Sequence, residues 1–583
     1  MENKQQKLRT CLQENHYIIP SYQSYGGLSG YQDYGILGTK IRNKVVSLWR
    51  DFFINDDSDT IVEIETPNIM PYNTLKASGH VDRFTDFVVY DVNGVCYRAD
   101  HLAKNWFKSN NMANTAEKVD TWDQQMLESN INKYKMVQCP VDESVKVQRK
   151  NLMFEVPSSV LASEHNIDFL RPELAQGIFV NYKVCQQFLQ KEPPFGISQV
   201  GKSYRKEISP QQYTRMREFW QAEIEYFVDP LNKTHPNFDM LKTTIIPIMT
   251  SDMQIKNVQT PLQVSIEEAV SKKLISHTLM AYFLAKIYLF ALKIGLNKVR
   301  FRQHLPHEMA HYASECWDLE TYVNDDWLEC VGCADRGSFD LQAHSSFGNT
   351  QLKARRQLVD GKTVVTLKPR LDMKIIGQRY KSQAVDIIQY FNNMGQTQLK
   401  DMADTMFREN DTMYISINDS ICVLTKDMIK IEEVITKIQH EDYYPHVIEP
   451  SFGIDRLIYS IFEQNFWARE SDGQRIVLSL PSALSPYNVA VFALSKNETL
   501  LPLVDSIRKT LSTSGFRCYL DNSSTNIGKR YSRVDEMGIK FAITVDFDSL
   551  VDNQVTIRER DSMTQIRVDI NKLLEHVSEL NSN

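Results

Sequence analysis

Five ionisable residues stand out within one short stretch of the sequence, residues 201–229. Arg205 and Glu207 lie in its first half, and Glu218, Glu223 and Glu225 lie in its second half. Ionised side chains aligned along a sheet must be paired, solvated or used on a ligand. The stretch therefore predicts either a surface hairpin laced by salt bridges or one wall of a binding site.

Residues of the same types recur far along the chain. Glu329 lies in a strand-like segment, and Glu449 and Arg456 flank a glycine turn at Gly453. Two arginines with several acids suit a nucleotide, because guanidinium groups neutralise phosphates and carboxylates hold Mg²⁺. The sequence contains no G-x-x-x-x-G-K-[ST], which excludes a P-loop. We expect an ATP site of another kind.

Two further motifs suggest zinc but fit it poorly. Residues 307–311, HEMAH, match HExxH, in which two histidines hold the metal. The longer pattern fails because Ser314 and Trp317 stand where glycine and histidine are needed. Cys330 and Cys333 form a CxxC without a second pair at zinc-ribbon spacing. We expect a structural helix at the first motif, buried thiols at the second, and no structural zinc.

The elements that must position these residues can be predicted from periodicity. Residues 201–229 predict two strands of an antiparallel hairpin, and the alternation over 218–227 indicates one packed and one available face. Residues 447–462 predict a strand, a glycine turn and a helix with Arg456 in its first turn. An amphipathic helix is expected over 35–53 and a strand over 60–64. Pro67 then marks a strand end or sheet edge that could receive a partner subunit.

Several other elements are expected by the same reasoning. Residues 266–294 should be helical, Asp360 and Gly361 signal a short hairpin, and a final helix is expected from Ser562. The most apolar window, residues 278–296, contains Lys286 and Lys293. It is better explained by a buried helix than by a membrane span.

Composition limits the class of protein. The chain has 583 residues, which suggests two to four domains, and its 42% hydrophobic and 24% charged content is that of a globular protein. A net charge of -7 excludes a generally basic nucleic-acid coat but permits a local basic groove. Nine irregularly spaced cysteines favour a reducing compartment, and no secretory signal is visible. We expect a cytoplasmic protein.

Six segments together resemble one enzyme family. The stretch around Arg205 is similar to motif 2 of class II aminoacyl-tRNA synthetases, residues 453–456 to motif 3, and the helix leading towards Pro67 to motif 1. The full set resembles glycyl-tRNA synthetases of the eukaryotic/archaeal homodimeric type, from about Tyr25 to the last helix. The segments are, in chain order, ASGHVDRF, RPELAQGIF, YRKEISP, REFWQAEIEYFVDP, LECVGCADR and VIEPSFGIDR.

The resemblance implies an α+β fold. A class II antiparallel β-sheet catalytic domain flanked by helices would span residues 1–480, with insertions at about 102–150, 230–300 and 341–444. A linker with two prolines and three serines, residues 479–486, leads to an α/β anticodon-binding domain at 481–583.

The implied activity is an ATP-dependent glycine–tRNA ligase. Glycine and ATP would give glycyl-adenylate and PPi, and glycine would then pass to the 3′-terminal adenosine of tRNA(Gly). The implied partners are glycine, ATP with Mg²⁺, tRNA(Gly) and a second copy of the chain in a homodimer, without a membrane.

The resemblance also assigns roles to single residues. Arg205, Glu207 and Arg456 are the implied catalytic residues: Arg205 at the α-phosphate, Glu207 at the adenine or the tRNA end, and Arg456 at the γ-phosphate. Glu329 would hold Mg²⁺ or the ribose. The implied ATP-binding residues are Arg205, Lys206, Glu207, Arg215, Met216, Glu329, Cys330 and Arg456. The implied glycine-binding residues are Glu173, Glu223, Glu449, Pro450 and Ser451, with Arg336 in support.

Glycine and tRNA make different demands. Glycine offers only its ammonium and carboxylate, so clustered carboxylates suit it. One methylene in a permissive pocket is worth only about 1–3 kcal/mol, so rejecting alanine needs a rigid wall. Lys529, Arg530 and Arg533 could attract tRNA, or could form a solvated face.

The chain departs from the family pattern at three places. Leu174 stands where the family has threonine, the loop between Pro210 and Arg217 is one residue short, and residues 344–347 are HSSF instead of HARA. These changes leave the implied phosphate and ammonium ligands in place. A synthetase-like accessory subunit is the rival interpretation, but the presence of Arg205, Glu207 and Arg456 disfavours it. A zinc peptidase is a distant third.

Overall fold

A nine-stranded sheet forms the centre of the computed structural model, which describes residues 4–55, 60–116, 118–138, 144–157, 167–309, 313–406, 412–417, 420–470 and 472–582. The strand order is β13-β12-β14-β15-β16-β21-β11-β10-β3; the β12–β14 and β10–β3 pairs are parallel and the other six are antiparallel. The predicted α+β class is confirmed. The strands are β3 (Ile61–Glu63), β10 (Phe195–Tyr204), β11 (Glu218–Val228), β12 (Ile245–Met249), β13 (Leu262–Ser265), β14 (Val299–Gln303), β15 (Glu315–Val323), β16 (Asp326–Gly337) and β21 (His446–Gly453).

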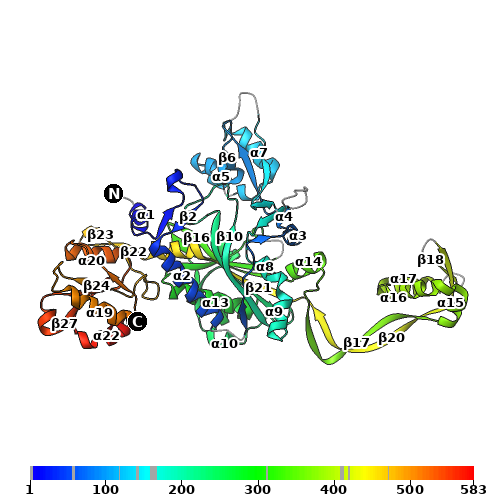
Figure 1. The fold of residues 1–583 in the computed structure, drawn as a ribbon. Coiled ribbons are helices and arrows are strands. Elements are labelled where there is room, and N and C mark those ends of the chain that lie inside the picture. The colour runs from blue at the N-terminus through cyan, green and yellow to red at the C-terminus, as the bar shows by residue number, and fades with distance from the viewer. Residues whose placement is uncertain are drawn as a thin grey trace. The chain divides into compact units, whose positions relative to one another are not determined.

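One face of this sheet packs against helices α2 (Ile36–Arg50), α13 (Thr278–Lys293) and α18 (Ile454–Gln464), which Figure 1 shows in part. Helix α13 is apolar nearly all round and buried, as its sequence predicts. Phe452 of β21 meets Trp49 and Phe53 on this side, with ring centroids 5.7 and 4.9 Å apart. Because neighbouring residues of a strand face opposite sides, Ser451 faces the other side of the sheet.

From Gln221 onwards the opposite face of β11 is buried as well, so the predicted available face is confined to the start of that strand, residues 218–220. Every residue of β11 from Gln221 to Val228 is buried, including Glu223 and Glu225. Helix α8 (Ala175–Val180) packs on β10 and β11, and α14 (Phe339–Phe347) packs on α8. Sequence alternation does not reveal this cover, because it comes from segments distant along the chain.

Residues 230–300 contribute to the sheet itself. We expect an insertion there, whereas β12 and β13 extend the central sheet next to β14.

Residues 99–133 form α5 (Ala99–Ser109), α6 (Ala113–Ala116) and α7 (Gln124–Lys133) around a small apolar core. The other elements are α1 (Lys4–Glu14), β1 (Ile18–Pro20), β2 (Gln32–Tyr34), β4 (Ile69–Met70), α3 (Tyr72–Ala77), α4 (His80–Arg83), β5 (Thr85–Tyr90), β6 (Cys96–Arg98), β7 (Gln148–Asn151), β8 (Glu155–Pro157), β9 (Ile167–Leu170), α9 (Tyr182–Leu189), α10 (Phe238–Leu241), α11 (Ser251–Ile255), α12 (Ile266–Ser271), β22 (Phe466–Arg469) and β23 (Asp472–Leu478).

Residues 353–443 form a separate compact unit. Its long strands β17 (Ala354–Leu371) and β20 (Ile429–Tyr443) pair as an antiparallel ribbon, which Figure 1 shows in green and yellow. The hairpin expected at Asp360 and Gly361 is wrong: both residues lie within β17, where the register shifts between Gln357 and Lys362. Gly361 has φ +67, so an irregularity in the strand explains the same sequence signal. The unit is completed by α15 (Met373–Tyr380), α16 (Ala384–Asn392), α17 (Gln396–Met406), β18 (Thr412–Ile417) and β19 (Ser420–Thr425).

Residues 489–582 fold around a five-stranded mixed sheet with the order β25-β24-β26-β27-β28. The first three strands are parallel, as the alternation of strands and helices predicts. The final helix begins at Leu573 and not at Ser562, because residues 554–569 form a hairpin with a polar turn. The strands are β24 (Val489–Ala493), β25 (Cys518–Leu520), β26 (Phe541–Val545), β27 (Gln554–Glu559) and β28 (Gln565–Asp569), and the helices are α19 (Leu501–Thr513), α20 (Ile527–Glu536), α21 (Ser549–Asp552) and α22 (Leu573–Ser582).

None of the helices in the described ranges combines the length and the apolar character that crossing a bilayer requires.

Candidate active site

An open cavity of about 460 Å³ lies on the face of the central sheet that carries Ser451. It is lined by residues from β11, β15, β16 and β21, from the start of α18 and from the segment that links β10 to β11. The residues with implied roles that line it are Arg205, Glu207, Arg215, Met216, Glu329, Cys330, Glu449, Ser451 and Arg456. The fold therefore brings together the two distant groups of residues singled out in the sequence.

Arg205 lies immediately after β10, at one end of the cavity. Its Nε donates to the backbone oxygen of Pro172 at 3.2 Å, and its guanidinium lies 5.4 Å from the ring centres of both Phe84 and Phe219. Glu207 Oε2 is 3.9 Å from Nε of Arg215. Aromatic rings beside a fixed guanidinium provide a surface on which a flat ring system and a phosphate could bind together.

Arg456 lies in the first turn of α18, as predicted. Its Nε donates to Thr214 O at 2.8 Å and its Nη1 donates to Glu329 O at 2.9 Å. The Glu329 carboxylate is 3.5 Å from Nη1 and its side chain is 56% exposed, so it remains accessible to a ligand. These two backbone contacts hold the guanidinium in place. A ligand that binds Arg456 therefore loses little affinity to the ordering of this side chain.

The strand register sets two rows of side chains across the cavity. Asp318 of β15 pairs with Gly332 of β16, which pairs with Ser451 of β21, which pairs with Glu223 of β11. Directly paired residues face the same side of a sheet, so these four share one face. In the second row, Cys316 pairs with Ala334 and Ala334 pairs with Glu449. The small residues Gly332 and Ala334 thus form the floor between two polar walls.

The wall on β11 and β21 is a buried group of carboxylates. Ser451 Oγ and the Leu174 amide donate to Oε1 and Oε2 of Glu223, both at 2.9 Å, and Glu223 is 1% exposed. Burial raises the pKa of Glu223 to about 8, and the charges of Glu449 and Glu173 add to the effect. Burial also raises the pKa of Glu449, against the opposing effect of Arg336. Such carboxylates gain most from a ligand that brings a positive charge.

Arg336 lies behind this wall and forms hydrogen bonds to two of the buried acids there. Its Nη1 donates to Glu449 at 2.8 Å, and its Nε and Nη2 donate to Asp340 at 2.8 and 3.0 Å. Glu173 lies 3.3 Å from His80 and accepts from Gln176 at 2.8 Å. Burial opposes ionisation of Glu173, but His80, Arg336 and the hydrogen bond from Gln176 together outweigh it, and the pKa of Glu173 is lowered overall. Glu173, Glu223 and Arg336 therefore support the cavity without lining it.

Glu225 is a buried acid that the sequence does not assign to the site. It is 0% exposed, and neither of its carboxylate oxygens has a hydrogen-bond partner in the described part of the chain. One of its oxygens lies within 4.8 Å of an oxygen of Glu223 and of an oxygen of Glu449. Burial raises the pKa of Glu225 well above its ordinary value, with Glu449 adding to the effect. Burial therefore favours the protonated form of this carboxyl.

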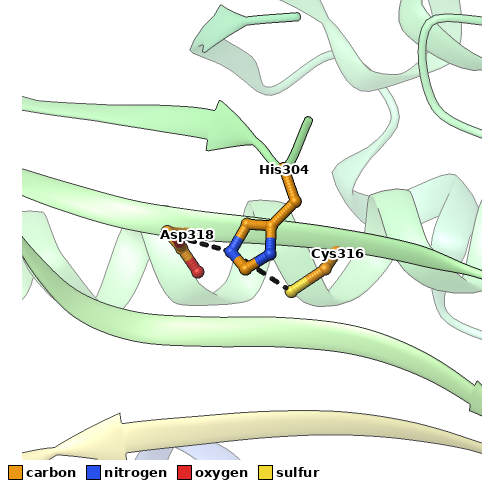
Figure 2. Close-up of side chains that lie close together, drawn as sticks. All are labelled: His304, Cys316 and Asp318. Carbon is orange, nitrogen blue, oxygen red and sulfur yellow. Dashed lines mark hydrogen bonds and ion pairs between the residues drawn. The ribbon is translucent and has the colours of Figure 1, made fainter. Parts of the chain in front are cut away.

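The opposite wall contains a polar group that sequence reasoning missed. His304 Nε2 lies 2.7 Å from Asp318 Oδ2 and 3.7 Å from Cys316 Sγ (Figure 2). All three residues line the cavity, and Asp318 is 3% exposed. The HExxH motif in the sequence begins at His307, three residues after His304. In the sequence, His304 is marked only by its position directly after the residues that form strand β14.

The HExxH segment itself does not form the expected helix in its described part. His307 and Glu308 lie in a turn, and Ala310 and His311 lie outside the described residues. Glu308 accepts hydrogen bonds from Arg302 Nη1 and the Leu305 amide, both at 2.8 Å. This carboxylate closes the turn, so it is occupied by the protein itself. Cys330 and Cys333 are 2% and 0% exposed, which confirms the prediction of buried thiols.

The remaining residues with expected roles also lie outside the lining of the cavity. The Lys206 side chain is exposed and outside the lining, and Pro450 lies between Glu449 and Ser451, so it faces the opposite side of β21. Arg530 is 2% exposed, and its Nη2 donates to Leu494 O at 3.0 Å. Because this guanidinium is buried against backbone, the geometry contradicts its predicted tRNA contact. Lys529 is exposed, and Arg533 is paired with Asp521 at 2.6 Å.

Comparison with known proteins identifies the family. The chain is 37% identical to the glycine–tRNA ligase of Methanocaldococcus jannaschii over 98% of both chains. The chain belongs to the glycine–tRNA ligase family. It is also 35% identical to glycine–tRNA ligase 1, mitochondrial, of Saccharomyces cerevisiae, over 99% of this chain and 91% of the yeast protein. The glycine–tRNA ligase of Caenorhabditis elegans is 35% identical over 98% of this chain and 79% of its own length.

A glycine–tRNA ligase needs a part that binds its tRNA, and the last domain supplies one. The family model described as an anticodon binding domain matches residues 488–580. This range coincides with the five-stranded sheet and its helices. The resemblance drawn from six sequence segments is thus confirmed, together with the class II architecture that it implies. The roles of the individual site residues stay predictions.

Proposed function

We propose that this chain activates glycine with ATP and transfers it to the 3′-terminal adenosine of tRNA(Gly). The observation that supports this proposal best is the composition of the cavity on the central sheet. Two anchored arginines, Arg205 and Arg456, lie among its lining residues together with the carboxylate Glu449 and the hydroxyl of Ser451. A nucleotide triphosphate and a small ammonium compound are the ligands that such a cavity suits.

The ATP end of the cavity is formed by the two arginines. Arg205 binds the α-phosphate and Arg456 binds the γ-phosphate, while the Phe219 ring beside Arg205 supports the adenine. Adenylate formation is mainly a matter of positioning and of neutralising charge on phosphates, which anchored guanidinium groups do well. Glu329 would hold Mg²⁺, whose charge neutralises phosphate oxygens; one exposed carboxylate plus phosphates is its usual ligand set.

The glycine end is formed by Glu449 and Ser451, with Glu223 directly behind. Glycine brings an ammonium into a group of acids whose pKa values are raised because they are buried close together. The ammonium supplies the missing positive charge, so binding favours their ionised form. Arg336 prevents Glu449 from turning away, because it holds this carboxylate from behind.

The last domain contacts the tRNA, and Lys529 and Arg533 of α20 are the residues that we retain for this role. A homodimer through the region of α2 and β3 remains part of the proposal, since β3 is the edge strand of the central sheet. A reducing compartment such as the cytoplasm fits the cysteines, eight of which are free thiols in the described chain.

The decisive experiment is amino-acid-dependent ATP–pyrophosphate exchange with the purified chain, performed with each of the twenty amino acids. We expect exchange with glycine and little with alanine. A folded protein that exchanges with none of them would overturn the proposal and favour an accessory subunit that binds nucleic acid. Charging of a tRNA(Gly) transcript then tests the second step.

A further inference from the structure

The cavity has a second polar wall with no assigned role, the group of His304, Cys316 and Asp318 (Figure 2). It lies across Gly332 and Ala334 from the wall formed by Ser451 and Glu449. Asp318 and Ser451 are two strands apart, which places them about 10 Å from each other at the usual strand spacing of about 4.8 Å. The role of this second wall must therefore fit a cavity that is about 10 Å wide at this level.

The hydrogen bonding of His304 is the second clue. Its Nε2 lies 2.7 Å from Asp318 Oδ2, so an ionised Asp318 holds the tautomer in which Nε2 carries the proton. The remaining nitrogen, Nδ1, is buried and has no hydrogen-bond partner within the described ranges. A buried nitrogen with a free lone pair is costly unless a ligand uses it. An aspartate that orients a histidine while its other nitrogen stays free is the arrangement of a general base.

A metal ion explains the same three residues less well. Two zinc ligands at bonds of about 2.0 Å and tetrahedral angles stand about 3.3 Å apart, whereas Nε2 and Oδ2 are 2.7 Å apart. Arg302 Nη2 lies 3.4 Å from Asp318 Oδ2 and would repel a cation at that oxygen. Burial also raises the pKa of the Cys316 thiol, and nearby Asp318 raises it further, which opposes the thiolate that zinc needs.

We propose that His304 is a catalytic residue of the transfer step and that its Nδ1 accepts the proton of the attacking ribose hydroxyl of the tRNA. Asp318 is a positioning residue that holds the imidazole through Nε2. The inference rests on the proposed function. Between the two walls there is room for a glycyl group held at Glu449 and Ser451, a hydroxyl at about 3 Å from its carbonyl carbon, and a base at about 3 Å from that hydroxyl.

The chemical step balances without any further reactant. The hydroxyl oxygen of the terminal adenosine forms a bond to the carbonyl carbon of glycyl-adenylate, and its proton moves to Nδ1. The bond between that carbon and the phosphate oxygen breaks, and AMP leaves with the electron pair. The products are glycyl-tRNA, AMP and a protonated His304, which Asp318 stabilises. Asp318 raises the pKa of His304 by hydrogen bond and charge, against the effect of burial, and so makes it a better base.

The test separates the two half-reactions in the full-length enzyme. His304→Gln keeps a donor for Asp318 but has no basic nitrogen, and Asp318→Asn removes the charge that orients the ring. Exposed His307, three residues away, provides the matched control His307→Ala. Glycine-dependent exchange measures adenylate formation, and single-turnover transfer from enzyme-bound adenylate to tRNA(Gly) measures the second step.

We expect His304→Gln to slow transfer about 100-fold or more while exchange stays within about threefold, and Asp318→Asn to slow transfer less. His307→Ala should alter neither rate. Normal transfer in His304→Gln, or an equal loss of both steps, would overturn the inference. Stoichiometric zinc that is bound to the unmodified enzyme and lost in His304→Gln would also overturn the inference, because a coordinated imidazole has no free lone pair. Absence of exchange in the unmodified enzyme would instead contradict the proposed function.

Discussion

Ser451 donates its hydroxyl to Oε1 of Glu223 at 2.9 Å, across the paired strands β21 and β11. The bond connects a residue that lines the cavity to an acid that lies behind it. The position of the Glu223 charge beneath the proposed ammonium site therefore depends on Ser451. Loss of this one hydroxyl should weaken glycine binding without touching the ATP end.

Ser451→Ala is expected to raise the KM for glycine about tenfold. A hydrogen bond to a charged group is worth about 1.5–3 kcal/mol, and about 1.4 kcal/mol corresponds to a factor of ten. The KM for ATP should change little, because the arginines are untouched. Initial rates of exchange at varied glycine and ATP measure both values. Ser514→Ala, at an exposed serine of the last domain, is the control; an equal rise in both KM values would contradict the prediction.

Glu223→Gln tests the charge itself. The amide can still accept a hydrogen bond from Ser451 or from the Leu174 amide, so the fold should persist. We expect the apparent KM for glycine to rise by more than in Ser451→Ala, since a charge is lost as well as a hydrogen bond. The same exchange assay gives the value, and an unchanged dependence on glycine would move the role to another acid.

Arg456→Ala should reduce glycine-dependent exchange about 100-fold or more, because a guanidinium that neutralises charge in the transition state is removed. The variant also loses hydrogen bonds to Thr214 O and Glu329 O, so thermal unfolding must be measured in parallel. Arg508→Ala, on the surface of α19, is the matched control. Near-normal exchange in Arg456→Ala would refute the role.

Glu225→Gln addresses the pH dependence of stability. The pKa of Glu225 is raised on folding, so between about pH 4.3 and its folded pKa the unfolded chain releases a proton that the folded protein keeps. The protein therefore loses stability as pH rises, by at most about 1.4 kcal/mol per pH unit for this group. The variant lacks this term, so the difference between its unfolding free energy and that of the parent should shift in favour of the variant as pH rises from about 5 towards the folded pKa of Glu225. Urea unfolding at a series of pH values measures this difference; parallel profiles would show that Glu225 is ionised or solvated.

Local patterns in the sequence predicted the elements that carry the site. The alternation over residues 218–227, the glycine turn before Arg456 and the buried helix in the window 278–296 all appear in the structure at nearly the expected places. The helix expected over 266–294 is interrupted at residues 272–277, between α12 and α13. Each depends on residues close together in the chain, where periodicity reflects the geometry of a strand or a helix. The six family-like segments likewise sufficed to indicate the family, and the domain boundaries remain predictions.

The tertiary structure decided what each side chain meets. Glu223 accepts from Leu174, 49 residues earlier, and Ser451, 228 residues later, and neither partner follows from a local pattern. Arg530 lies in a basic segment of the sequence, but packing buries it against backbone. His304 carried no motif, and only the pairing of β14, β15 and β16 places it across the cavity from Ser451. Local sequence fixes backbone conformation through short-range sterics and periodicity, whereas burial and partners depend on contacts between distant segments that form only when the chain packs.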